Sequence, residues 1–108
     1  MSQKWADYLI TRVHYDRYRQ GYSVWKRINS VETRVDSEGG IGSAQVWMRQ
    51  KVVDAINHGQ TFVTSVQRND GLFYKGAEIE VVRINNTDYI RTDRDSTTED
   101  NLGSLPEF

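Results

Sequence analysis

The sequence has 108 residues, of which 37% are hydrophobic and 11% aromatic, as expected for one domain with a modest core. It contains no cysteine, which excludes disulfides and thiolate metal sites and favours a reducing, cytoplasmic location. The formal net charge is −1, so the whole chain exerts no general attraction on nucleic acids or anionic lipids.

The first third of the chain predicts two strands joined by a loop. Residues 5–15 alternate two sets of side chains and are rich in β-branched and aromatic types, which is typical of a strand. Residues 16–21 are polar and end in glycine, so we expect a loop there. Residues 22–35 predict the returning strand, with a kink or bulge at Asn29 and Ser30.

The middle of the chain predicts one helix. Residues 36–42 contain three glycines and break the preceding strand. We expect the helix to cover residues 43–58, with Ser43 as the N-cap and Gly59 at the C-terminal position where φ is often positive. The residues spaced as its buried stripe are Met48, Val52, Ala55 and Ile56.

The last third predicts four more strands. Residues 61–66 and 72–74 form short strands on either side of a turn at residues 69–71. Residues 75–92 contain the clearest hairpin, because an alternating segment is interrupted at residues 85–87 by side chains that tolerate positive φ. We expect the other elements to pack on this hairpin.

This order of elements predicts an α+β fold. We expect a mostly antiparallel twisted sheet, or a partial small barrel, of about six strands with the single helix at about residues 43–58. Residues 1–108 form one domain, and residues 93–108 dock on it as a C-terminal tail. A tail that is free and binds a partner is the alternative. The apolar residues expected to dock the tail are Leu102, Leu105 and Phe108.

No motif in the sequence predicts catalysis, a metal or a cofactor. Nucleophile motifs and phosphate-binding loops are absent, and His14 and His58 are the only histidines. An acidic cluster in the tail lacks the spacing of a calcium loop. Its members are Asp93, Asp95, Glu99 and Asp100. We therefore predict a chain that is not an enzyme; an enzyme would need one histidine beside a carboxylate of this cluster.

One segment combines aromatic and basic residues in the way that binding surfaces do. Residues 15–27 interleave tyrosine, tryptophan, arginine and lysine around the first predicted loop, a composition that suits protein partners, including a second copy of the chain. Stacking on unpaired bases makes single-stranded nucleic acid the alternative partner. If Tyr22 and Trp25 instead pack in the sheet, the segment is structural. The candidate residues are Arg17, Tyr18, Arg19, Tyr22, Trp25, Lys26 and Arg27.

Membrane partners are not expected. No segment approaches the ~20 consecutive apolar residues that span a bilayer, and the first ten residues lack the apolar run of a signal peptide. The leading prediction is therefore an interaction module without catalytic activity, which binds its partner through the hairpin at residues 17–27 or through an uncovered edge of the sheet.

Three segments resemble a small bacterial family described only as a domain of unknown function. They read ADYLITRVHYD, INHGQTFVT and YIRTDRDSTTEDNLGSLPEF. The resemblance covers most of the chain and is weakest over residues 17–36. It implies a bacterial, cytosolic protein and supplies no activity, cofactor or catalytic residue. The tail positions that match are Arg91, Asp93, Asn101, Leu102, Gly103, Leu105 and Pro106.

Overall fold

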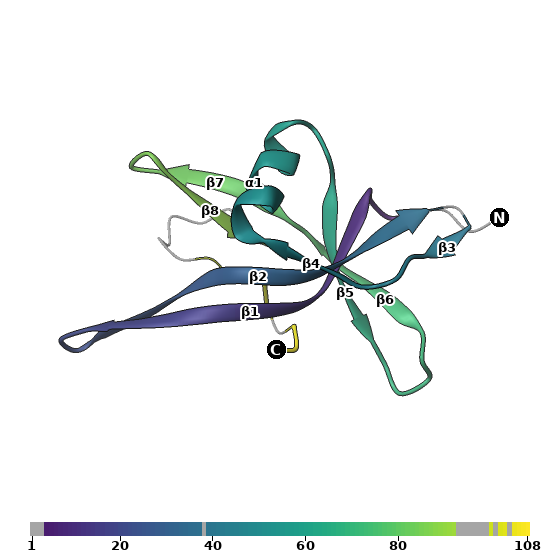
Figure 1. Cartoon of the computed structure of the whole chain (residues 1–108), viewed down its shortest axis with the longest axis horizontal. Coiled ribbons are helices and arrows are strands. Elements are labelled where there is room, and N and C mark those ends of the chain that lie inside the picture. Colours follow the sequence, from purple (N-terminus) through teal and green to yellow (C-terminus); the bar gives the residue numbers. More distant parts are fainter. Residues whose placement is uncertain (1–3, 38, 93–99, 101, 104) are drawn as a thin grey trace.

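A computed structural model describes residues 4–37, 39–92, 100, 102–103 and 105–108 (Figure 1). The elements in chain order are β1 (Tyr8–Gln20), β2 (Ser23–Ser37), β3 (Gly40–Ile41), β4 (Gln45–Met48), α1 (Arg49–Asn57), β5 (Phe62–Gln67), β6 (Phe73–Glu78), β7 (Glu80–Ile84) and β8 (Thr87–Arg91). Within these residues, a six-stranded sheet has the order β3-β2-β1-β5-β6, and β4 pairs with β2. Strands β7 and β8 form a separate two-stranded sheet.

A long hairpin of β1 and β2 is the central element of the molecule. Its antiparallel register continues to the pair Gln20–Ser23, so only Gly21 and Tyr22 form the turn. Gly21 has a φ of 61°, which glycine adopts without strain. The prediction of a loop over residues 16–21 is wrong. Residues 16–20 are paired with β2 through their backbone groups, and polar side chains suit a ribbon that solvent reaches on both faces. The hairpin projects from the rest of the molecule (Figure 1).

The bulge predicted in the second strand is confirmed. Tyr15 pairs with Ile28, and His14 pairs with Ser30, so Asn29 is an extra residue on β2. Such a residue increases the local twist of the hairpin.

The sheet is mixed and open. Strand β1 pairs with β5 in parallel, in the register Tyr8–Phe62 to Ile10–Thr64, whereas the other strand pairs are antiparallel. The α+β class is therefore confirmed, but the prediction of a mostly antiparallel sheet is only partly right, and the described strands do not close into a barrel. The parallel pair is possible because β2, β4 and α1 lie between β1 and β5 and let the chain return in the same direction.

The helix is shorter than predicted at its N-terminal end. Helix α1 begins at Arg49, and the four residues before it form β4. Trp47 is buried and pairs with Val31, so burial against the sheet outweighs the helical spacing of this segment. Ser43 is not the N-cap; that position is Met48, which makes no side-chain capping hydrogen bond.

The rest of the helix prediction holds in part. Val52 is buried as expected, but Val53 is buried as well, and Met48 is exposed. Gly59 follows the helix with a φ of 95°, and its N–H donates to the carbonyl of Ile56 at 3.0 Å, as predicted for this position.

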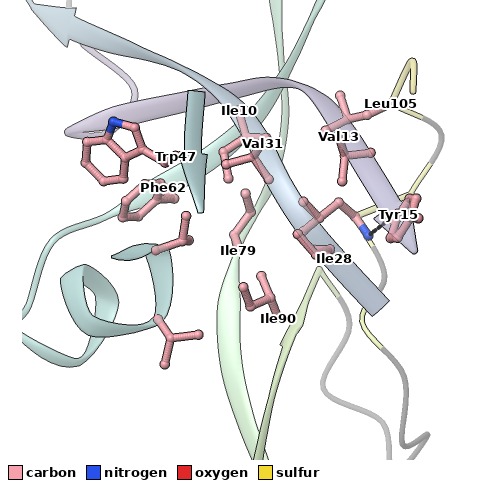
Figure 2. Packing of buried hydrophobic residues seen from close by; sticks show 13 residues of the cluster. Ile10, Val13, Tyr15, Ile28, Val31, Trp47, Phe62, Ile79, Ile90 and Leu105 are labelled. Carbon is pink, nitrogen blue, oxygen red and sulfur yellow. Dashed lines mark hydrogen bonds between the residues drawn. The ribbon is translucent and has the colours of Figure 1, made fainter. Parts of the chain in front are cut away.

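The hydrophobic core lies between the sheet, α1 and the β7–β8 hairpin (Figure 2). Tyr8 packs on Trp47 and Phe62, with ring centroids 4.7 and 5.1 Å apart. The other core members include Ile10, Val13, Tyr15, Ile28, Val31, Val52, Val53, Ile79, Ile90, Leu102 and Leu105. No helix in the described part of the chain is long and apolar enough to cross a bilayer.

The predicted C-terminal hairpin is confirmed as β7 and β8. Asn85 and Asn86 form its two-residue turn with φ values of 51° and 65°, the left-handed values that such turns require. The hairpin is not the element on which the others assemble, however. It contributes Ile90 to the core but pairs with neither β1 nor β2 within the described residues.

Candidate functional site

The outer end of the β1–β2 hairpin exposes several large apolar side chains. Tyr18 and Trp25 pair across the strands, and their rings stack with centroids 5.9 Å apart. They remain 41% and 38% exposed. Tyr22 in the turn is fully exposed, so it does not pack in the sheet, and Val24 is exposed beside it. These four side chains are the apolar part of the candidate site.

The basic side chains of the candidate site are divided between the two faces of the hairpin. Residues directly opposite one another in the register share a face. Arg17 and Lys26 therefore lie on the face of Tyr15, and the Lys26 Nζ is 4.3 Å from the centre of that ring. Arg27 lies on the other face, with Trp25. The aromatic and basic residues that alternate in the sequence are thus distributed over two opposite faces of the hairpin.

Arg27, on the face that carries the stacked rings, lies between a groove and a smaller pocket. A groove of about 260 Å³ lies between this part of the hairpin and the start of α1, where Tyr18 and Met48 line it. A smaller pocket of about 130 Å³ lies between Trp25 and Tyr89 of β8. Arg27 lines both. We call Tyr18, Trp25, Arg27 and Met48 the hairpin face.

The positive charge at this end of the hairpin is only partly neutralised within the described part of the chain. Arg17 donates two hydrogen bonds to the Glu107 carboxylate, at 2.8 and 3.1 Å. In the described part of the structure, Arg19 and Arg27 make no hydrogen bond and no ion pair. An exposed guanidinium beside aromatic rings is a strong contact for a carboxylate or phosphate of a partner.

Asp100 and Arg49 line the smaller pocket. The Asp100 carboxylate accepts hydrogen bonds from Arg49 and from the backbone N–H groups of Ile28 and Ile90. The other members of the acidic cluster of the tail, Asp93, Asp95 and Glu99, lie outside the described residues. Among the described residues no group of three potential ligands is placed to hold a metal ion.

The role of Asp100 could not be recognised from the sequence. Its partners lie 10, 51 and 72 residues away in the chain. The only available signal was its place in the DNLG segment of the tail, which resembles the family pattern.

The two histidines lie on separate elements. His14 on β1 has its Nε2 3.8 Å from Asp16 Oδ1, and its Nδ1 contacts the carbonyl oxygen of Phe108. His58 follows α1, and its Nδ1 lies 2.7 Å from the carbonyl oxygen of Asp54. Neither contacts Asp100, the carboxylate of the tail cluster that the structure describes. The His58 contact is a helix-end interaction.

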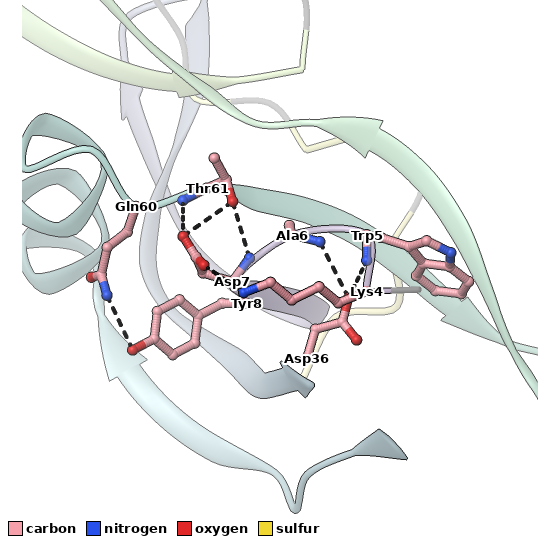
Figure 3. Close-up of polar contacts among 8 residues, drawn as sticks. All are labelled: Lys4, Trp5, Ala6, Asp7, Tyr8, Asp36, Gln60 and Thr61. Carbon is pink, nitrogen blue, oxygen red and sulfur yellow. Dashed lines mark hydrogen bonds and ion pairs between the residues drawn. The ribbon is translucent and has the colours of Figure 1, made fainter. Parts of the chain in front are cut away.

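A second group of polar contacts involves residues 4–8, at the end of the β1–β2 pairing away from the turn (Figure 3). Asp36 accepts hydrogen bonds from the N–H groups of Trp5 and Ala6, at 2.5 and 3.2 Å. Asp7 accepts from the N–H of Thr61 at 2.9 Å. Together with Lys4, this bond holds the pKa of the Asp7 carboxyl below its usual value. These contacts attach residues 5–7 to β2 and to Thr61, the residue before β5.

Comparison with known proteins places the chain in a family. A search of curated proteins and a search of solved structures each gave no match. One family model, described as "Protein of unknown function (DUF3892)", matches residues 10–106, which include all eight strands at least in part and the described tail up to Pro106. The resemblance seen in the sequence is thereby confirmed, and the chain belongs to this family of proteins of unknown function.

Proposed function

We propose that this chain is an interaction module without catalytic activity, which binds a protein partner through the hairpin face. The observation that carries the proposal is the exposure of Tyr18 and Trp25 on the hairpin face, with the exposed turn residue Tyr22 next to them at one projecting end of the molecule (Figure 1). Scattered exposed apolar side chains are normal, whereas a contiguous group beside a groove is typical of an interface.

The residue types support a protein partner. Tyrosine, tryptophan and arginine provide most hot spots in protein interfaces, and Tyr18, Trp25 and Arg27 are adjacent on one face. The stacked pair already limits the motion of both rings, so binding would cost less side-chain entropy. The groove between Tyr18 and Met48 could accept one side chain of the partner.

The experiment is a comparison of captured proteins. Full-length chain is immobilised, and proteins retained from a bacterial lysate are quantified for the wild type, for Tyr18→Ala/Trp25→Ala and for Tyr74→Ala. Tyr74 is a matched control because it is an aromatic residue of another hairpin with the same 38% exposure as Trp25. A partner retained by the wild type and the control, but reduced at least tenfold with the double variant, supports the proposal. Equal retention by all three contradicts it.

Self-association is tested in the same variants. Sedimentation velocity over a range of concentrations would show a dimer as a rise in the sedimentation coefficient. If the hairpin face binds a second copy, the rise disappears in Tyr18→Ala/Trp25→Ala and persists in Tyr74→Ala.

Single-stranded nucleic acid is the second candidate partner. The specific observation in its favour is the stacked Tyr18–Trp25 pair beside Arg27, which has no partner within the described chain. Stacking of one base on an aromatic ring contributes about 1–3 kcal/mol, and the phosphates would contact Arg27 beside the rings, with Arg19 on the opposite face of the same ribbon. Fluorescence anisotropy with short single-stranded DNA and RNA at two salt concentrations tests this candidate.

The salt dependence distinguishes the two candidates. Micromolar binding that weakens sharply at higher salt, and is lost in Arg19→Ala/Arg27→Ala, would favour nucleic acid. Absence of binding at low salt, where the attraction of charges is strongest, would leave the protein partner. The proposal also includes a bacterial, reducing cytoplasm as the setting, supported by the cysteine-free sequence.

A further inference from the structure

The end of the chain is bound to β1 in the manner of an added strand. The N–H of Val13 donates to the carbonyl of Pro106, and the N–H of Phe108 donates to the carbonyl of Val13, each at 3.0 Å. Glu107 thereby lies beside Val13 in a parallel bridge. Peptides that bind proteins by strand addition use the same backbone contacts.

The side chains of this segment contact two distinct features of the β1 surface. Glu107 forms a two-pronged ion pair with Arg17, at 2.8 and 3.1 Å. The ring of Phe108 lies 5.2 Å from the guanidinium carbon of Arg12 and 5.9 Å from the His14 ring. An acidic residue followed by an aromatic one is therefore the side-chain pattern that this edge accepts.

The tail is held strongly at one end and weakly at the other. Leu102 and Leu105 are buried in the core, which anchors the segment before Pro106. Phe108, by contrast, is 40% exposed, and both members of the Arg17–Glu107 ion pair are about half exposed, so solvent screens the pair. The last three residues are therefore held to β1 by backbone hydrogen bonds and surface contacts rather than by core packing.

We propose that the edge of β1 from Val13 to Arg17 is an acceptor site for an extended peptide of a partner protein, in which an acidic residue precedes an aromatic residue. Pro106, Glu107 and Phe108 occupy this site within the chain and compete with the partner for it. The site lies along the edge of β1 and involves different side chains from the hairpin face, so it goes beyond the proposed function and is tested separately from it.

A labelled peptide tests the proposal directly. The probe is a fluorescein-labelled peptide of sequence GSLPEF, which copies residues 103–108, and its anisotropy is measured with full-length chains. The variant Glu107→Ala/Phe108→Ala removes the side chains that hold the competing tail. We expect it to bind the peptide roughly tenfold more tightly than the wild type, since a tail that filled the site about nine-tenths of the time would weaken the apparent affinity by that factor.

Charge reversal identifies the site. When added to Glu107→Ala/Phe108→Ala (the tail variant), Arg17→Glu should weaken binding of GSLPEF roughly tenfold, whereas Arg19→Glu should change it little. Arg19 is the matched control because it lies two residues further along the same face of β1, without contact to Glu107. A peptide with arginine in place of the glutamate, GSLPRF, should recover binding to the Arg17→Glu chain.

Three results would overturn the proposal. They are the absence of saturable binding to the tail variant, equal losses from Arg17→Glu and Arg19→Glu, and failure of GSLPRF to recover binding. If the wild type forms a dimer that GSLPEF dissociates, the occupant is a second copy rather than a different partner. Circular dichroism and thermal melting of every variant show that the fold is retained, which is expected because the substituted side chains are exposed.

Discussion

The guanidinium of Arg49 forms two hydrogen bonds with the buried carboxylate of Asp100, with Nε–Oδ2 and Nη2–Oδ1 distances of 2.8 and 3.0 Å. The same carboxylate accepts the N–H groups of Ile28 on β2 and Ile90 on β8, at 2.9 and 2.8 Å. Arg49 also donates to the carbonyl of Asp88. One tail residue thus joins the large sheet, the start of α1 and the β7–β8 hairpin.

Substitution of Asp100 should destabilise the whole domain. Asp100→Ala leaves the guanidinium of Arg49 and two buried N–H groups without their acceptor, and loss of one partner from a buried pair costs about 3–5 kcal/mol. Because small domains are stable by only about 5–15 kcal/mol, this is a large share of the free energy of unfolding. Urea unfolding at neutral pH measures the loss.

The control for Asp100 is an exposed aspartate with a single side-chain partner. Asp54→Ala removes a hydrogen bond from Gln50 on the surface of α1 and should cost less than about 1 kcal/mol. A similarly small loss for Asp100→Ala would show that Asp100 does not join the three elements.

Gly76 should not tolerate a side chain. Gly76 and Ala77 of β6 lie opposite Thr64 of β5 in a bulge, and a Cβ on Gly76 would lie 2.2 Å from Thr64 Oγ1 and 2.8 Å from the Thr64 carbonyl oxygen. Because one of these atoms belongs to the backbone, the strands must separate. We expect Gly76→Ala to cost about 1–3 kcal/mol, as overpacking does.

Thermal melting measures this effect against a glycine in open space. Gly39 has no atom within 4 Å of an added Cβ, and its φ is not positive. Gly39→Ala should therefore leave the melting temperature unchanged or slightly higher. Equal melting temperatures for the Gly76 and Gly39 variants would show that β5 and β6 do not approach closely at this bulge.

The two ends of the described tail should differ in their contribution to stability. Leu102 is 2% exposed, and its truncation to alanine should cost about 2–5 kcal/mol through lost burial and a cavity. Phe108→Ala should cost less than about 1 kcal/mol, since that ring lies on the surface. Chemical denaturation of both variants gives the comparison, and a larger loss for Phe108 than for Leu102 would reverse this assignment.

Acid should weaken the contact between Arg12 and Glu32. Burial raises the pKa of Glu32, but hydrogen bonds from Arg12 at 2.8 Å and from Thr11 at 2.7 Å outweigh it and hold the pKa below its usual 4.5. A carboxyl group with a pKa lower in the folded than in the unfolded chain stabilises the fold above that usual value. This stabilisation is lost as the pH falls from about 4.5, the usual pKa of the Glu32 carboxyl, through the lower pKa that this carboxyl has in the folded chain.

Unfolding free energies measured from neutral pH down to acid should therefore decrease below about pH 4.5 for the wild type. Glu32→Gln should be less stable at neutral pH and should approach the wild type in acid. The exposed Glu78→Gln should follow the wild-type curve. A difference between the wild type and Glu32→Gln that does not change with pH would contradict the prediction.

Features that depend on neighbouring residues were predictable from the sequence. The turn at Asn85 and Asn86, the end of α1 at Gly59 and the bulge at Asn29 all follow from local backbone preferences. The β1–β2 pairing was predicted as well, but its extension through residues 16–21 was not. A segment of polar residues gives no sign that its backbone is paired when both faces of the ribbon are solvated.

The sequence by itself determined the class of fold, the β7–β8 hairpin and the residue types available at the hairpin end. Only the tertiary structure decided that residues 45–48 are a strand, that β1 and β5 are parallel, and that Arg17 and Arg27 lie on opposite faces. It also decided the partners of Asp100. The physical reason is that turns and helix ends depend on local φ and ψ preferences, whereas these features depend on burial and hydrogen bonds between residues far apart in the chain.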